Sequence, residues 1–156
     1  MKTSWLAFVV VLCMGFGQAS TVATASSNIT GEEIRAFDFG YNGAPQGDRE
    51  AGPYGFTFTN TDPTGAHEII IVRMASANVG ATNDKILAAI DKGPKSLCPT
   101  GCFFDAFGGF AFTGPLSTTP GFGFLSPGRY AYFCAVREAD GTPHYKLGMF
   151  GTFWAK

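Results

Sequence analysis

The chain has 156 residues, a length that fits a single domain. It carries 11 Lys and Arg against 12 Asp and Glu, for a formal net charge of −1. This balance, without any basic run, excludes the electrostatic signature of a nucleic-acid-binding protein. With 16 Phe, 21 Gly and 9 Pro, the composition favours short strands and tight turns over a helical bundle.

The N-terminus has the pattern of a secretory signal peptide. A lysine precedes an apolar run at residues 5–16, and small residues follow it. Cleavage is expected after Ala25, with Ala19 as the alternative, so a signal peptide at 1–25 precedes one domain at 26–156. A retained membrane anchor is the other interpretation, but the run has 12 residues against the roughly 20 that span a bilayer. We therefore expect a secreted or periplasmic protein with no membrane span in its mature form.

Apolar periodicity predicts a series of strands with one helix among them. Alternation predicts strands at residues 33–41 and 54–59, and β-branched residues predict another at 68–74. The one helix candidate spans 82–92, because a capping residue begins it and Gly-Pro ends it. Short Phe- and Gly-rich segments start at residue 103, and further strands are expected at 122–125, 129–136 and 149–154. The series predicts an all-β sandwich or barrel with one short inserted helix.

The cysteine count leaves one thiol without a partner in the chain. Removal of the signal peptide leaves Cys98, Cys102 and Cys134. Cys98 with Cys102, across a turn that contains Pro and Gly, is the favoured one of three possible disulfides. Cys134 is then a free thiol in an oxidising compartment, where an unprotected thiol is a liability. It is either a small buried apolar residue or a metal ligand.

Further metal-binding side chains accompany Cys134. The chain has only two histidines, His67 before a predicted strand and His144 downstream of Cys134, and Met149 follows soon after. A thiolate and two imidazoles in a plane, with a weak thioether above them, form the ligand set of a blue copper site. The sequence gives no grounds for a catalytic site made of a nucleophile with its base, or of two paired carboxylates. We therefore do not expect an enzyme.

Two segments resemble the copper-binding segments of the plastocyanin-like cupredoxins. The pattern YxYxC that ends at Cys134, followed by PHxxxGMxG from Pro143, is similar to the family's C-terminal copper loop. The pattern FxN at 58–60, then a Gly- and Pro-containing turn, is similar to the first histidine segment. The resemblance implies a cupredoxin-like Greek-key β-sandwich or barrel that holds one copper ion. By this resemblance the metal ligands are His67, Cys134, His144 and Met149.

Two positions depart from the family pattern. Residues 135–143 separate Cys134 from His144, where the family usually has only a few residues. Such a loop can still return to the site, because closure entropy grows slowly with length. The residue after the first histidine, commonly Asn in the family, is Glu68, which would place a negative charge near the metal or compete as a ligand.

The resemblance implies electron transfer by a mononuclear type 1 copper site. The expected protein is a monomer that meets a redox partner protein in weak, transient contacts. In the family, electrons usually pass through the exposed edge of the loop histidine, here His144. Its neighbours Pro143, Tyr145 and Phe150 would then form an apolar docking rim.

A metal-free cupredoxin-like binding or structural module is the alternative. In that interpretation Cys134 and Met149 only fill the core, and the histidines are incidental. The two hypotheses differ in the loop at 135–143, which the metal-free alternative expects to lie away from His67.

Overall fold

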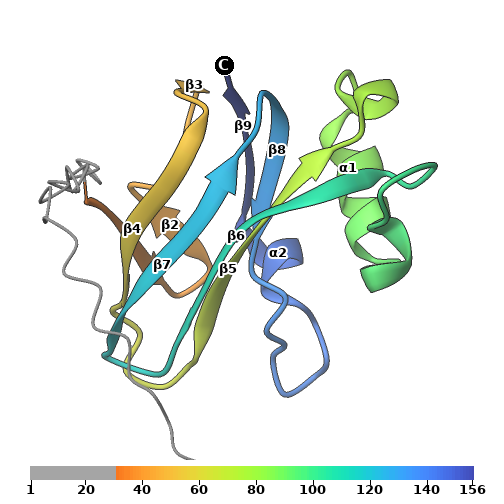
Figure 1. Cartoon of the computed structure of the whole chain (residues 1–156). Coiled ribbons are helices and arrows are strands. Elements are labelled where there is room, and N and C mark those ends of the chain that lie inside the picture. Colours follow the sequence, from red (N-terminus) through yellow and green to blue (C-terminus); the bar gives the residue numbers. More distant parts are fainter. Residues whose placement is uncertain (1–30) are drawn as a thin grey trace, which may run out of the picture.

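The computed structural model describes residues 31–156, so the predicted signal peptide lies outside the described residues. Nine strands form one sheet in the order β2-β1-β4-β7-β6-β5-β8-β9-β3 (Figure 1). The strands are β1 (Glu32–Phe37), β2 (Gly40–Asn42), β3 (Asp48–Arg49), β4 (Gly52–Asn60), β5 (His67–Met74), β6 (Phe104–Thr113), β7 (Thr118–Leu125), β8 (Gly128–Phe133) and β9 (Phe150–Ala155). The helices are α1 (Asn83–Ile90) and α2 (His144–Leu147), with 3-10 turns η1 (Ser76–Asn78) and η2 (Gly93–Ser96). None of the helices at 31–156 is long and apolar enough to cross a membrane.

The sheet curls until its two halves meet. β3 is the last strand in this order and pairs in parallel with β9. Only residues 50–51 separate β3 from β4, which lies near the opposite end of the order. The backbone N–H of Ala51 donates to the carbonyl oxygen of Lys156 at 2.9 Å, which holds the end of β9 beside this connection. The predicted all-β barrel is therefore confirmed.

The observed elements refine three predicted ones. The strand expected at 33–41 is split into β1 and β2, because Asp38 has a φ of 35° and turns the chain. The helix expected at 82–92 is α1. The Phe- and Gly-rich segments after residue 103, expected to be short, form the long strands β6 and β7.

The strand β8 separates two apolar clusters. Tyr130, Tyr132 and Cys134 belong to an inner cluster within the barrel, together with residues of β1, β4 and β5. Ala131 and Phe133 belong to an outer cluster, which includes the buried residues of α1. Because side chains alternate along a strand, β8 is buried on both faces, as the alternation in its sequence predicts.

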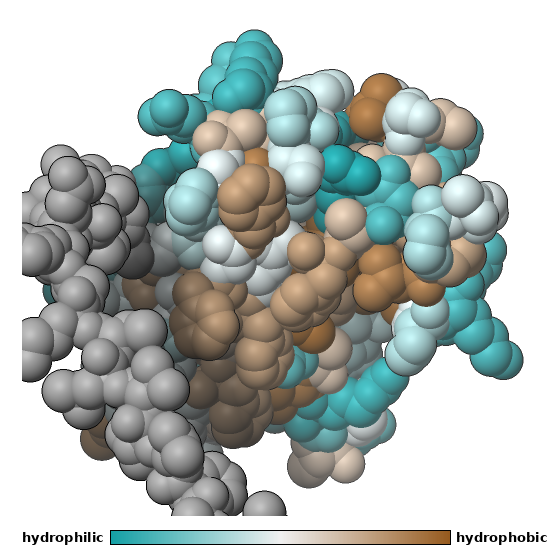
Figure 2. Space-filling model, viewed as in Figure 1, coloured by the Kyte–Doolittle hydropathy of each residue, from teal (hydrophilic) through white to brown (hydrophobic). Residues whose placement is uncertain are grey.

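The strands β6 and β7 approach each other closely where glycines face each other. Gly109 pairs with Gly123, and a Cβ atom added to Gly123 would collide with the backbone of Gly108 and Gly109. The side chains that point away from the barrel here are apolar yet exposed, and Figure 2 shows apolar residues gathered on this face. They are Phe107, Phe110, Phe112, Phe122 and Phe124.

Cys98 and Cys102 are joined by a disulfide after η2. Among residues 31–156, Cys134 is the free cysteine, and it is buried. Changing both disulfide cysteines to serine is expected to lower the free energy of unfolding by about 2 kcal/mol, because the short loop is no longer closed in the unfolded chain. Urea denaturation measures this difference. The wild-type protein under reducing conditions should match the variant, and equal stability of the oxidised wild type and the variant would contradict the expectation.

Candidate metal centre

His67, Cys134 and His144 come together at one end of the barrel, and all three side chains are buried. Their possible ligand atoms lie within 4.8 Å of one another. Nδ1 of His144 is 3.1 Å from Nδ1 of His67 and 3.5 Å from Sγ of Cys134. Two imidazole nitrogens and one sulfur therefore face a common point, and this donor set suits a copper ion.

His67 is the first residue of β5, and a buried asparagine shapes the turn before it. The side-chain amide of Asn60 donates to the carbonyl oxygens of Gly65 at 2.7 Å and Gly114 at 2.9 Å. Its Oδ1 accepts from the backbone N–H of Asp62 at 2.9 Å. Asn60 thus satisfies backbone groups that no strand pairs, and these bonds fix the entry of His67 into the site.

Backbone hydrogen bonds tie Cys134 to the segment that carries the other two predicted ligands. The N–H of Cys134 donates to the carbonyl oxygen of Met149 at 3.1 Å, and its own carbonyl oxygen accepts from Tyr145 N–H at 2.9 Å. The N–H of Met149 donates to the carbonyl oxygen of His144 at 3.1 Å. Met149 is fully buried in the same inner cluster as Cys134. All four predicted ligands are therefore held in one buried region.

The long loop at 135–143 folds back on itself and returns to the site. The backbone N–H of Glu138 donates to the carbonyl oxygen of Thr142 at 2.9 Å, which makes a small hairpin. The N–H of His144 then donates to the carbonyl oxygen of Val136 at 2.9 Å. The metal-free alternative expected this loop to lie away from His67, and that expectation is wrong.

A carboxylate faces the outer nitrogen of each histidine. Nε2 of His144 lies 2.6 Å from Oε1 of Glu138. Nε2 of His67 is fully buried, 3.3 Å from Oδ2 of Asp62, but it makes no well-aligned hydrogen bond. Hydrogen bonds from Thr64 and Gly65 lower the pKa of Asp62 to about 2, so this carboxylate is charged at neutral pH. Glu138 thus favours the tautomer of His144 that has its proton on Nε2, which leaves the Nδ1 lone pair for a metal. The negative charge of Asp62 favours the same tautomer of His67.

Glu68 joins β5 to the residue after Cys134. Its Oε1 accepts from the backbone N–H of Ala135 at 2.9 Å, and its own backbone N–H points at Sγ of Cys134 at 3.5 Å. Burial raises the pKa of the Glu68 carboxyl. This carboxylate is not part of the converging donor group, so it links the two ligand segments rather than competing for the metal.

Burial also sets the protonation of the ligands themselves. It raises the pKa of the Cys134 thiol to about 11. Burial, and then the neighbouring His144, lower the pKa of His67. Both groups are therefore neutral at pH 7 before a metal binds, and a bound cation has to displace the thiol proton.

His144 is covered by protein rather than exposed. Its side chain is 2 % exposed, because the Glu138 carboxylate caps Nε2 and the ring of Phe39 packs edge-on at 5.3 Å between centroids. Pro143 and Tyr145 are buried as well. The expected exposed histidine edge with its rim of neighbours is therefore wrong. Phe39, which is 41 % exposed, is the apolar side chain that joins His144 to the surface.

An open polar cavity of about 510 Å³ lies beside His144. Its lining includes the carboxylates of Asp38, Asp62 and Glu138 and the guanidinium of Arg137. Three acidic residues against one basic residue favour the approach of cations to this side of His144. Neither Asp62 nor Glu138 could be singled out from the sequence, because nothing in their spacing links them to the histidines.

Comparisons with known proteins give matches only among solved structures. No protein-family model matches the chain, and no curated protein does. A reduced auracyanin from Roseiflexus castenholzii is 25 % identical, with 80 % of this chain and 94 % of that chain covered, at a TM-score of 0.49. Auracyanin A, a "blue" copper protein from Chloroflexus aurantiacus, is 18 % identical over 80 % and 96 % of the two chains, also at 0.49. Amicyanin from Paracoccus versutus is 14 % identical over 85 % and 87 %, at 0.42.

These matches stand as similarities, and the fold itself rests on the strands of this chain. The curled nine-stranded sheet and the burial of β8 on both faces define the architecture. The buried group of two histidines and one cysteine lies where the YxYxC strand and the FxN turn meet. The chain is thus an all-β protein whose nine strands form one curled sheet, and the auracyanin structures are similar to it over 80 % of its length.

Proposed function

We propose that the protein is an exported electron carrier that exchanges one electron through a single type 1 copper ion. His67 and His144 would bind the ion through Nδ1, Cys134 through its thiolate, and Met149 through a weak axial thioether. The observation that carries this proposal is the convergence of two Nδ1 atoms and one Sγ atom within 4.8 Å. Copper fits because soft sulfur ligands favour Cu(I) while imidazoles accept Cu(II).

The burial of the donors supports electron transfer rather than catalysis. The side chains of His67, Cys134 and Met149 are fully buried, and His144 nearly so, as suits a site that exchanges electrons without binding a substrate. Ligands fixed by hydrogen bonds and packing would keep nearly one geometry in both oxidation states, so that little rearrangement would oppose the transfer of an electron.

Adding Cu(II) to the purified chain at 26–156 tests the proposal. We expect one equivalent to bind and to give intense visible absorption from thiolate-to-copper charge transfer. Reduction should remove the band and reoxidation should restore it. Zn(II), which also accepts nitrogen and sulfur ligands, is the comparison. A protein that stays colourless with Cu(II) would contradict the proposal, even if it binds Zn(II).

Export and partner complete the proposal. The predicted signal peptide would carry the chain out of the cytoplasm. The compartment outside is oxidising, so the disulfide can persist there. A redox partner would dock over Phe39, which is exposed and contacts the His144 ring. A small, short-lived contact suffices for electron exchange, and we expect the carrier to be a monomer.

Glu138→Gln is expected to raise the reduction potential of the copper site. The amide oxygen can still accept from Nε2 of His144, but the negative charge that stabilises Cu(II) is gone. The expected rise in reduction potential is on the order of 50 mV. It corresponds to a loss of about 1 kcal/mol of electrostatic stabilisation of Cu(II) in a one-electron couple. Redox titration of the visible band gives the potential.

Glu50→Gln is the matched control for this change. Glu50 is an exposed carboxylate in the connection from β3 to β4, and its neutralisation should leave the potential almost unchanged. Equal potentials in wild type and Glu138→Gln would mean that the Glu138 carboxylate does not act on the metal.

A further inference from the structure

A second cavity, of about 310 Å³, lies between the outer face of the sheet and the segment from α1 to η2. β8 runs between the inner cluster, which contains Cys134 and Met149, and this outer side, and Arg137 lines both this cavity and the one beside His144. Its walls are mostly apolar side chains. β5 contributes Ile70 and Val72, and β6 contributes Phe104 and Phe107. The other large apolar side chains are Ile90 of α1, Leu97 after η2, Phe133 of β8 and Tyr145 of α2.

The size and lining of this cavity are those of a ligand site. Small-molecule pockets begin at about 300 Å³ and are lined mainly by apolar and aromatic residues with a few polar groups. An apolar cavity of about 150 Å³ is enough to hold benzene. The cavity is open to solvent on one side, since Asp91, Leu97 and Phe107 of its lining are exposed, so a ligand can enter it without a rearrangement of the fold.

Two residues of opposite charge line the cavity, and one of them has a carboxylate oxygen that can accept a hydrogen bond. Asp91 and Arg137 are both exposed lining residues. Oδ1 of Asp91 accepts from the hydroxyl of Tyr145 at 2.6 Å and pairs with Nζ of Lys146 at 2.9 Å. Within residues 31–156, Oδ2 of Asp91 has no such partner. The carboxylate therefore retains an oxygen that can accept a hydrogen bond from a bound hydroxyl group.

The wall contributed by the η2 segment is held in place before any ligand binds. The N–H of Leu97 donates to the carbonyl oxygen of Pro94 at 3.1 Å, and the N–H of Cys98 donates to that of Phe104 at 3.1 Å. The disulfide from Cys98 to Cys102 closes the turn directly after this wall. A preformed wall reduces the entropy that binding has to overcome.

We propose that this cavity binds a small neutral aromatic molecule that carries a hydroxyl group, of the phenol or quinol class. The ring would lie among the aromatic walls, and the hydroxyl would donate to Oδ2 of Asp91. A neutral molecule fits because the charges of Asp91 and Arg137 offset each other. The cavity is complete without a metal, so this proposal does not depend on the copper site.

Titration of the ¹⁵N-labelled chain at 26–156 with 2-naphthol tests the proposal. Saturable shifts are expected in the backbone amide signals of Ile90, Leu97 and Tyr145, which line the cavity. Naphthalene, which lacks the hydroxyl, should bind several-fold more weakly, because it cannot donate a hydrogen bond to the Asp91 carboxylate. Shifts that do not saturate, or that centre on the exposed rings of β7, would overturn the proposal.

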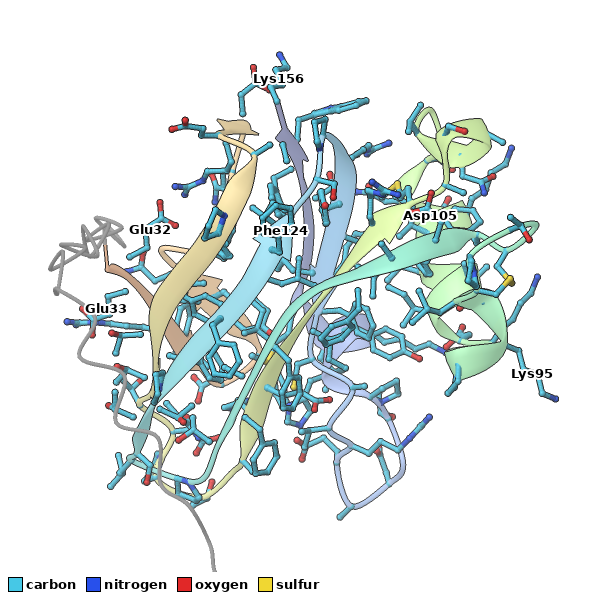
Figure 3. The ribbon with its side chains drawn as sticks, viewed as in Figure 1. Glu32, Glu33, Lys95, Asp105, Phe124 and Lys156 are labelled. Carbon is cyan, nitrogen blue, oxygen red and sulfur yellow. A yellow bond between two sulfur atoms is a disulfide. The ribbon has the colours of Figure 1, made fainter. Side chains whose placement is uncertain are left out.

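Variants separate the cavity from the rest of the apolar surface. Ile70→Trp fills the cavity and should weaken 2-naphthol binding at least tenfold. Phe107→Ala removes a wall ring that is already 55 % exposed, so the fold is kept, and binding should fall about threefold to tenfold. Phe124→Ala is the matched control, because Phe124 is 61 % exposed on β7. Figure 3 shows Phe124 far from Lys95, which belongs to η2 and so marks that wall of the cavity. Equal losses in Phe107→Ala and Phe124→Ala would show that the ligand binds surface rings and not the cavity.

Discussion

Cys134→Ser is expected to abolish the intense visible absorption of the copper-loaded protein. The band requires a thiolate bound to copper, and Cys134 is the free cysteine of the described chain. A serine hydroxyl has nearly the same shape but does not ionise at neutral pH, so it offers neither the sulfur nor the charge. The measurement is the visible spectrum after one equivalent of Cu(II) is added to each protein.

The variant without the disulfide is the control for this result. Cys98→Ser with Cys102→Ser also removes two sulfur atoms, but from a turn beyond η2, and it should keep the full absorption. Circular dichroism of Cys134→Ser establishes that the barrel is still folded. A folded Cys134→Ser protein that still shows the band would rule Cys134 out as the ligand.

Gly123→Ala is expected to lower the free energy of unfolding by about 3 kcal/mol, the upper end of what overpacking costs. The added methyl group would collide with the backbone of Gly108 and Gly109, which no side-chain rotation can relieve. β6 and β7 would have to separate at the place where the two halves of the sheet are joined. Urea denaturation, with tyrosine or tryptophan fluorescence as the signal, measures the loss.

Gly80→Ala is the matched control. A Cβ at Gly80 meets nothing within 4 Å, and the position lies in the loop before α1. The stability of this variant should stay within about 0.5 kcal/mol of the wild type, as for most exposed substitutions. If both alanine variants lose the same stability, the close approach of β6 and β7 is not what makes Gly123 necessary.

The sequence predicted the strands whose side chains alternate cleanly. β8 could be recognised because Tyr130, Tyr132 and Cys134 share one face and Ala131 and Phe133 the other. α1 could be recognised from its apolar stripe and the Gly-Pro that follows it. β6 and β7 were predicted less well, because alternating Phe and Gly looks like a series of turns unless a partner strand needs the close approach.

The candidate site was predictable only in its sulfur and imidazole donors. Two histidines and one unpaired cysteine left few choices, and their order along the chain carried the resemblance. The carboxylates of Asp62 and Glu138 could not be found in this way, because their approach to Nε2 depends on the folding of two loops. The burial of His144 was missed for the same reason, since the hairpin at 135–143 has no periodic pattern to reveal it.

The burial of β8 on both faces has a thermodynamic consequence. At its end, Phe133 and Ala135 line the outer cavity while Cys134, between them, points into the metal centre. Residues that line the cavity therefore flank a predicted metal ligand directly in the chain, and we expect binding at one site to affect binding at the other. Thermodynamic linkage makes any such effect reciprocal. If a bound metal changes the affinity of the cavity for its ligand by some factor, the bound ligand changes the affinity for the metal by the same factor.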